Sequence, residues 1–419
     1  MDFYTTFVYI ITFIGLFAIS FYVINLFLYK KPKDEEGEKP SKVSIIIPAY
    51  NEEKTIVNTI KSALSIDYPK ILFEVIVVDD GSKDKTYELA KKFASSLSPK
   101  VRVFTKSNGG KGSALNLGIK HAAGEVIISM DADTFVTPDA VSKMMSYFYS
   151  KDVMSVTPSM GVQEPRTIWQ MVQQIEYYVG TFLRKSFATI NAIHVTPGAF
   201  SAYRKEFFEK YGGYDEGNLT EDLEIALRMQ SKGFIIENAP EATVYTRAPA
   251  RFMPLLVQRR RWYAGLVKNL WAYRRLFGFK RGPLGYLTLP LAIISIFTSM
   301  FLTTYAIVKT IDNLHHELGS LSMINFKFHN TFELNSFIIQ RFFLNIFSQP
   351  VFVITFLFLV IIGCYLIFAR KKMKFGESLK LSYLIFMVFY SILFTTWWVI
   401  SLSYVLFNRK VAWREHAKE

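Results

Sequence analysis

Short apolar runs alternate with polar stretches of helical spacing between Lys42 and about Pro240. Apolar runs of this length, bounded by turn residues, are typical of buried strands, and the stretches between them are long enough for helices. The alternation predicts an α/β domain with a parallel sheet and right-handed crossovers, in which ligands bind at the carboxyl ends of the strands. We expect strands at 43–47, 73–78, 101–104 and 125–130, and helices at 52–65, 85–96 and 113–123.

The apolar stretch near the N-terminus has a different pattern. Residues 7–28 carry no charge and are long enough to cross about 30 Å of hydrocarbon as a helix. They lack the basic start and the cleavage site of a signal peptide, so we expect an uncleaved anchor. Lys30, Lys31 and Lys33 follow directly and place this end of the helix in the cytoplasm. Residues 31–41 are predicted to form a flexible linker.

Three further long apolar stretches, at 286–308, 351–368 and 379–407, are predicted to span the membrane. The stretch 336–347 contains Gln340 and Arg341, which favours an interfacial position. Three full spans after a cytoplasmic domain would leave the C-terminus outside. The basic residues of the tail 409–419 favour the inside, so one late segment could instead be re-entrant or bent, and the sequence leaves this open.

The net charge of +14 is compatible with nucleic acid, an anionic membrane surface or an acidic substrate as partner. Many of the basic residues lie beside apolar stretches, and 51% of all residues are hydrophobic, with a mean hydropathy of +0.20. This distribution favours a multi-pass membrane protein with cytoplasmic basic loops over a nucleic-acid-binding protein. The single cysteine, Cys364, excludes an internal disulfide and a metal–thiolate site.

Acidic residues follow two of the predicted strands. Asp79 and Asp80 end one apolar run, and Asp131 and Asp133 follow another. Carboxylate oxygens in an Asp-x-Asp arrangement are suitable ligands for Mg²⁺ or Mn²⁺, which a nucleotide-sugar diphosphate needs as it leaves. Taken alone, the first pair is better explained by an ordinary turn, and an isolated Asp-x-Asp also occurs by chance.

Two shorter motifs could carry chemistry. In the glycine-rich stretch 108–112 the backbone can approach a ligand closely, and Lys111 supplies a positive charge, although a plain glycine turn is an alternative. Thr220 precedes Glu221 and Asp222 at the start of a predicted helix, 221–230. Asp222 could be a general base, or Thr220 could be an ordinary N-cap with two acids in the first turn.

Residues 250–281 are rich in arginine and aromatic residues and include Gln258, Arg261 and Trp262. An arginine can bind a diphosphate with two donors, and a tryptophan can stack on a sugar ring. Amphipathic helices on the cytoplasmic membrane surface would have the same composition, and we expect this arrangement for most of the segment.

Taken in order, these motifs resemble the processive, inverting glycosyltransferases of family 2, which include the poly-N-acetylglucosamine, cellulose, hyaluronan and chitin synthases. The resemblance covers about 43–262 and rests on PAYNE, VVDDGS, NGGKG, DAD, TPGAFSAYR, TED and QRRRW. It implies a GT-A (Rossmann-like) domain joined to a membrane channel, a UDP-sugar donor, a polysaccharide acceptor and Mg²⁺ or Mn²⁺. The chain length and membrane layout are most similar to the poly-N-acetylglucosamine synthases, which often depend on a small membrane partner subunit.

The resemblance also implies a role for each matching residue. Asp222 corresponds to the catalytic base, Asp133 to the metal ligand, and Asp131 to its partner in the Asp-x-Asp pair. The remaining matches concern the substrates. Tyr50 and Asp80 correspond to residues at the nucleotide base, Glu52 lies in the same loop as Tyr50, and Lys111 corresponds to a lysine at the donor. In the Gln-x-x-Arg-Trp motif formed by Gln258, Arg261 and Trp262, the resemblance implies that Arg261 contacts the diphosphate and Trp262 the acceptor.

The sequence therefore predicts an anchor at 1–30, a linker at 31–41, a catalytic domain at 42–249, a basic segment at 250–283, membrane helices at 284–408 and a tail at 409–419. Two other functions remain possible. A single-transfer enzyme would glycosylate a lipid or a polyprenyl phosphate, but such relatives generally lack QRRRW. A membrane-tethered protein that binds anionic lipid or nucleic acid would leave Asp131, Asp133 and Asp222 without a role.

Overall fold

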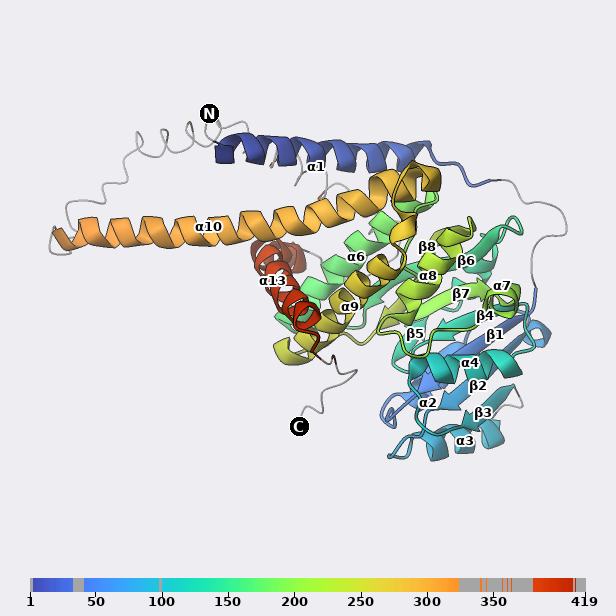
Figure 1. The fold of residues 1–419 in the computed structure, drawn as a ribbon. Coiled ribbons are helices and arrows are strands. Elements are labelled where there is room, and N and C mark those ends of the chain that lie inside the picture. The colour runs from blue at the N-terminus through green and yellow to red at the C-terminus, as the bar shows by residue number, and fades with distance from the viewer. Residues whose placement is uncertain are drawn as a thin grey trace.

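The computed structural model describes residues 3–32, 41–97, 100–323 and 380–409, together with single positions at 340, 344, 356, 360, 363 and 411. Its described part contains one sheet with the strand order β3-β2-β1-β4-β7-β6-β8-β5 (Figure 1). The strands are β1 Val43–Ala49, β2 Phe73–Asp79, β3 Val101–Thr105, β4 Val126–Met130, β5 Thr134–Val136, β6 Val153–Val162, β7 Phe200–Arg204 and β8 Ile235–Thr246.

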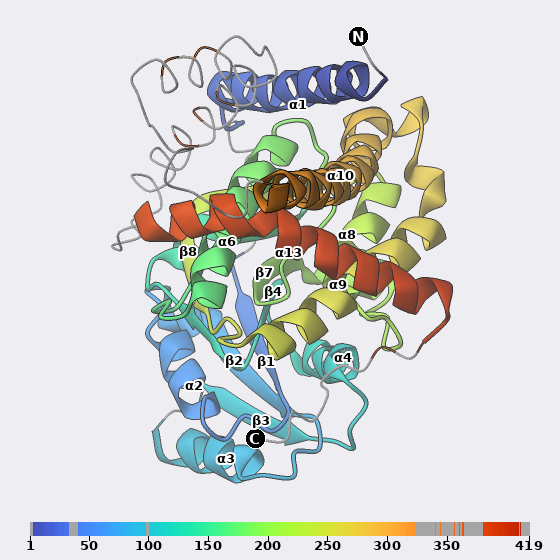
Figure 2. The same ribbon diagram turned by 90° about the vertical axis from the view of Figure 1, so that its left-hand side faces the viewer.

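Helices cover both faces of this sheet and extend beyond it (Figures 1 and 2). In the catalytic region these are α2 Ile56–Leu64, α3 Thr86–Leu97, α4 Lys111–His121, α5 Ala140–Met145, α6 Ile168–Ala188, α7 Lys205–Tyr211, α8 Glu221–Ser231 and α9 Phe252–Ala272. The long apolar helices are α1 Phe3–Leu28, α10 Leu289–Met323 and α13 Lys380–Leu406.

The central strand β1 is buried along its whole length, and its alternate residues face two separate cores. Ile45 belongs to the core that includes Ile56 and Ile60 of α2. Its neighbour Ile46 belongs to the other core, with Leu115 of α4. A strand covered by helices on both faces favours apolar residues on both of its faces, which explains the nearly continuous apolar run in the sequence.

The four predicted strands and their parallel pairing are confirmed, since β2, β1 and β4 pair in parallel and β3 pairs with β2. The sheet as a whole is mixed, so the expectation of a parallel sheet was wrong for most of its second half, where β6 and β8 pair in parallel but the other pairs are antiparallel. Strand β7 runs antiparallel to both β4 and β6. Helix α6 returns the chain to the carboxyl end of β4, and β7 begins there, with Phe200 opposite Met130.

Two helix starts differ from the sequence prediction. Helix α2 begins at Ile56 and not at Glu52, because Asn51 has φ 54° and the Glu52 carbonyl accepts from the amides of Thr55 and Ile56 in a tight turn. Helix α4 begins at Lys111, two residues early, directly after Gly110 with φ +86°. This positive φ favours glycine, and it brings Lys111 into the first turn of the helix.

Three helices are long and apolar enough to cross a membrane among the residues that the structure describes: Thr6–Leu28, Leu284–Asp312 and Leu381–Leu406. The predicted spans at 7–28, 286–308 and 379–407 correspond to them. Apart from the single positions given above, the predicted span at 351–368, the interfacial stretch 336–347 and most of the tail 409–419 lie outside the described residues.

Helices α6, α9 and α13 pack against one another beside the sheet (Figure 2). In α13, 28% of the most apolar stretch is buried within the protein, whereas none of the corresponding stretch of Leu284–Asp312 is buried. Figures 1 and 2 show α10 extending away from the domain while α13 crosses over the layer formed by α6 and α9. α13 is therefore the apolar helix most closely integrated with the catalytic region.

Candidate active site

The loops after β1 and β2 are joined by hydrogen bonds at the carboxyl ends of these strands. The amide of Asn51 donates to the Ser82 hydroxyl at 2.9 Å, and the amide of Glu52 donates to the Thr86 hydroxyl at 2.7 Å. The Glu52 carboxylate accepts from Thr55 at 2.8 Å. This fixed backbone places Tyr50, which is half-buried, beside the loop that contains Asp80.

Asp80 is buried and holds the glycine-rich loop. Its carboxylate accepts hydrogen bonds from the amides of Gly109 at 3.0 Å and Gly110 at 2.7 Å, and from Lys106 Nζ at 3.0 Å. The preceding Asp79 accepts from Thr105 Oγ1 at 2.8 Å and closes the turn. The two adjacent aspartates thus make different contacts. Asp79 binds Thr105, whereas Asp80 connects the end of β2 to the loop that precedes Lys111.

Lys111 lies beside acidic residues from two parts of the chain and a backbone carbonyl from a third. Its Nζ lies 2.5 Å from Asp131 Oδ1 and 3.4 Å from Glu221 Oε1, and it donates to the Gly198 carbonyl at 3.3 Å. Burial by itself would lower the pKa of Lys111, but the charges of Asp131, Glu221 and Asp222 outweigh it and raise the pKa above its usual range. Lys111 therefore stays a cation.

Asp222 lies in the first turn of α8 and belongs to the same cluster. Its Oδ2 accepts from the Gly198 amide at 3.1 Å, its Oδ1 accepts from the Leu223 amide at 2.9 Å, and its carbonyl accepts from Thr196 Oγ1 at 2.8 Å. A Cβ added at Gly198 would lie 2.7 Å from Lys111 Nζ and 3.3 Å from Asp222 Oδ2. The TPGAF loop is thus packed directly between the lysine and the predicted base.

Glu221 lies deeper than Asp222. Burial raises the pKa of the Glu221 carboxyl, and Lys111 opposes this shift. The sequence predicts Glu221 only as a favourable charge at a helix start. Its burial beside Lys111 makes it part of the charged cluster, and its place next to Asp222 in TED is the signal that could have indicated this.

Helix α9 carries Gln258, Arg261 and Trp262 along the side of this cluster. Arg261 Nη1 donates to the Leu219 carbonyl at 2.9 Å, which joins the helix to the chain just before Asp222. The Arg259 guanidinium lies over the Trp262 ring, 4.1 Å from its centroid. Gln258 Oε1 is buried and accepts no hydrogen bond from the described residues.

The middle arginines of this motif are not on a membrane surface, which corrects the expectation for this part of the basic segment. Arg259 is fully buried and pairs with Glu176 of α6 at 2.6 Å. Arg260 is 5% exposed and lies over the Tyr404 ring of α13 at 4.4 Å. Both are buried because α6 and α13 cover α9 and supply a carboxylate and aromatic faces for their charges.

The residues that could hold a divalent metal are Asp131 and Asp133, directly after β4. Among the described residues no group of three or more His, Cys, Asp or Glu side chains has a metal-binding arrangement. Two carboxylates without further protein ligands fit Mg²⁺, which keeps water and substrate phosphates as its other ligands. Tyr177 of α6 lies nearby: burial raises its pKa to about 12, and the negative charges of Glu176 and Asp133 add to this effect.

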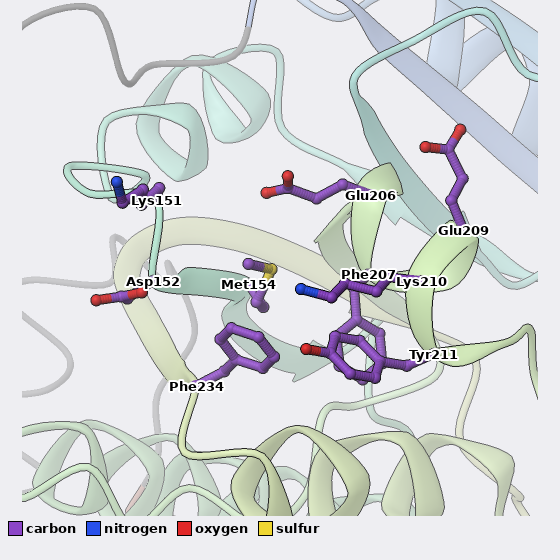
Figure 3. A pocket seen from close by; sticks show the side chains of 9 residues that line it. All are labelled: Lys151, Asp152, Met154, Glu206, Phe207, Glu209, Lys210, Tyr211 and Phe234. Carbon is purple, nitrogen blue, oxygen red and sulfur yellow. The ribbon is translucent and has the colours of Figure 1, made fainter.

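A cavity of about 460 Å³ lies elsewhere, at the opposite end of the sheet (Figure 3). Ser155 near the start of β6 pairs with Tyr203 near the end of β7, whereas Phe200 at the start of β7 pairs with Met130 beside Asp131. The cavity wall combines aromatic rings with charges of both signs and consists of Lys151, Asp152, Met154, Glu206, Phe207, Glu209, Lys210, Tyr211 and Phe234. It contains none of the predicted site residues.

The structure therefore joins Lys111, Asp131 and Asp222 through Gly198 and brings α9 beside them. A comparison of the sequence with family models identifies a family for part of this region. Residues 44–212 match the model of glycosyl transferase family 2. The chain carries a glycosyltransferase family 2 domain. The expected family and the GT-A fold are confirmed.

Relatives and solved structures extend this picture. The chain is 29% identical over 273 residues to poly-beta-1,6-N-acetyl-D-glucosamine synthase of Staphylococcus epidermidis, covering 62% of this chain and 65% of the relative. It is 30% identical over 269 residues to the enzyme of that name from Staphylococcus aureus strain COL, covering 63% and 64%. The matched region thus spans a little under two thirds of the length of these relatives.

The fold resembles the mannosyltransferase PcManGT from Pyrobaculum calidifontis, solved in complex with GDP-Man and Mn²⁺. The TM-score is 0.60 at 18% identity, and the match covers 97% of this chain and 100% of the other. At this identity the likeness concerns the fold alone. The match extends beyond the glycosyltransferase domain, because nearly the whole chain is covered.

Proposed function

We propose that this protein is a membrane-bound polysaccharide synthase that transfers a sugar from a UDP-sugar, with inversion, to a growing β-linked polymer of the poly-N-acetylglucosamine type. The glycosyltransferase domain faces the cytoplasm, and the polymer leaves through the membrane helices. The relatives named poly-beta-1,6-N-acetyl-D-glucosamine synthase support this choice of product. A small partner subunit stays a prediction from the resemblance.

The observation that carries the proposal is the position of Asp222. Its Oδ2 is held by the Gly198 amide, and the Gly198 carbonyl accepts from Lys111, which in turn pairs with Asp131. A base and the donor-side charges are therefore fixed to one short loop. Such a fixed carboxylate can accept a proton by position, although an ordinary carboxylate is a weak base.

In the proposed reaction the acceptor hydroxyl attacks the anomeric carbon of the donor, and its proton passes to Asp222. The bond from that carbon to the diphosphate breaks, so an α-linked donor gives a β-linked product and UDP. Arg261 and Lys111 offset the negative charge of the departing diphosphate. Mg²⁺ or Mn²⁺ bound by Asp131 and Asp133 would supply further positive charge to the same phosphates.

Purified protein in detergent, incubated with several UDP-sugars and metal, tests the proposal through UDP release. The variant Asp222→Asn should lose release while it still binds UDP, because only the chemical step needs the base. If residues 220–222 only cap a helix, the same variant should lose about 1 kcal/mol of stability or less and keep its turnover. Product size separates a long polymer from a single sugar added to a lipid or polyprenyl phosphate.

A further inference from the structure

The chain just before Asp222 is held by α9 through a pair of asparagines. Asn269 is 3% exposed, and its Nδ2 donates to Asn218 Oδ1 at 3.0 Å, while Asn218 Nδ2 donates back to Asn269 Oδ1 at 2.9 Å. Asn269 Nδ2 also donates to Thr220 Oγ1 at 2.9 Å. In this reciprocal pair each amide donates to the other, so the loop that contains Asn218 is fixed to α9 by two hydrogen bonds.

The same contacts explain why Thr220 does not act as the expected helix cap. Thr220 occupies the N-cap position of α8, but its hydroxyl makes no capping hydrogen bond and faces α9 instead. Gly265 allows this close approach, because a Cβ there would lie 2.4 Å from Thr220 Oγ1 and 2.6 Å from Cγ2. A capping bond has been exchanged for a contact with the neighbouring helix.

Three consecutive residues therefore depend on α9. Asn218 and Thr220 contact Asn269, and the carbonyl of Leu219 between them accepts from Arg261. Asp222 follows two residues later. The helix that carries Arg261 therefore also holds the chain that leads into Asp222.

We propose that Asn269 is a positioning residue for Asp222: it holds the 218–220 loop so that the base lies where the acceptor hydroxyl is bound beside α9. This inference rests on the proposed function. Asn269 acts only through the loop, so its loss should slow the chemical step. It should have little effect on UDP binding, because of the proposed UDP contacts only Arg261 lies on α9, whereas Tyr50, Asp80 and Lys111 lie on other elements. Small displacements of a reacting group are sufficient to lower a rate by about a hundredfold.

The test compares Asn269→Ala with Asn238→Ala, a matched control. Asn238 is also fully buried, and its Nδ2 donates to Thr157 and Pro158, far along the chain from Asp222. We expect Asn269→Ala to lower kcat for UDP release by about tenfold to a hundredfold with the Kd for UDP within twofold of wild type. Asn238→Ala should lower the melting temperature and keep kcat of the folded fraction within about threefold.

The variant Gly265→Ala changes α9 where the helix contacts the same loop. It should also lower kcat, because the added Cβ would displace Thr220. Gly180→Ala in α6 is the control, since its Cβ would meet only Arg184 Nη1, at 3.4 Å. Unchanged kcat in both the Asn269 and the Gly265 variant, or a Kd for UDP that rises in parallel with the loss of kcat, overturns the inference. Wild-type protein that releases no UDP would instead contradict the proposed function itself.

Discussion

Arg259 and Glu176 form an ion pair of 2.6 Å between α9 and α6 in which the arginine side chain is completely buried and the glutamate is 19% exposed. The guanidinium also lies over the rings of Trp262 and Trp397, so one cation joins three helices. This ion pair holds α9, which carries the QRRRW motif, against α6.

Glu176→Gln should destabilise the folded protein in detergent by about 3–5 kcal/mol, because it leaves a buried guanidinium without its counter-charge. Glu164→Gln is the control: its pair with Arg166 is 2.7 Å long, but the two side chains are 66% and 81% exposed. We expect a change within about 0.5 kcal/mol there. Thermal unfolding of both variants measures the difference, and similar losses would contradict the structural role of Arg259.

Metal dependence is the second prediction. Asp133→Asn should abolish UDP release while the protein keeps its wild-type melting temperature, because the proposed metal contacts the donor and not the core. EDTA should stop the wild-type reaction, and added Mg²⁺ or Mn²⁺ should restore it. Full turnover in EDTA would reject Asp131 and Asp133 as metal ligands.

Acid sensitivity should depend in part on Glu74. Burial alone would raise its pKa, but hydrogen bonds from Ser44 and Ala123 and the charge of Arg102 hold the pKa below its ordinary value of 4.5. Its contribution to stability is therefore present above pH 4.5 and is lost as the pH falls through the lowered value of the folded state. Glu74→Gln should lower the melting temperature at pH 7 and flatten its decrease toward pH 3. An equally steep decrease in both proteins would count against this role.

The side of the membrane on which the C-terminus lies can be measured by cysteine labelling in a Cys364→Ser background. The basic linker and the basic tail predict that Lys33→Cys and Lys418→Cys are both labelled from the cytoplasmic side. The packing of α13 on α6 and α9 is compatible with a last helix that does not cross fully. Labelling of Lys418→Cys from outside alone would mean that all three late apolar stretches span.

Local sequence was sufficient for the first half of the sheet and for the acids at its edge. The strands β1, β2, β3 and β4 are mostly apolar runs, and a parallel sheet brings their carboxyl ends to one edge, where Asp80 and Asp131 lie. The order of the motifs indicated the family. The strands β6 and β7 were not predicted, because they contain polar residues such as Ser155 and Ser201 that only the folded protein buries.

Tertiary structure decided which way individual side chains point. The arginines of QRRRW have the same pattern on a membrane surface as in a buried layer, and only the approach of Glu176, 83 residues earlier, distinguishes the two. The sequence TED is compatible with a capped helix as well as with a catalytic base. Thr220 instead faces Asn269, 49 residues later, because Gly265 lets the two elements touch. Contacts between residues so far apart in the chain depend on how the helices pack, and no local pattern contains that information.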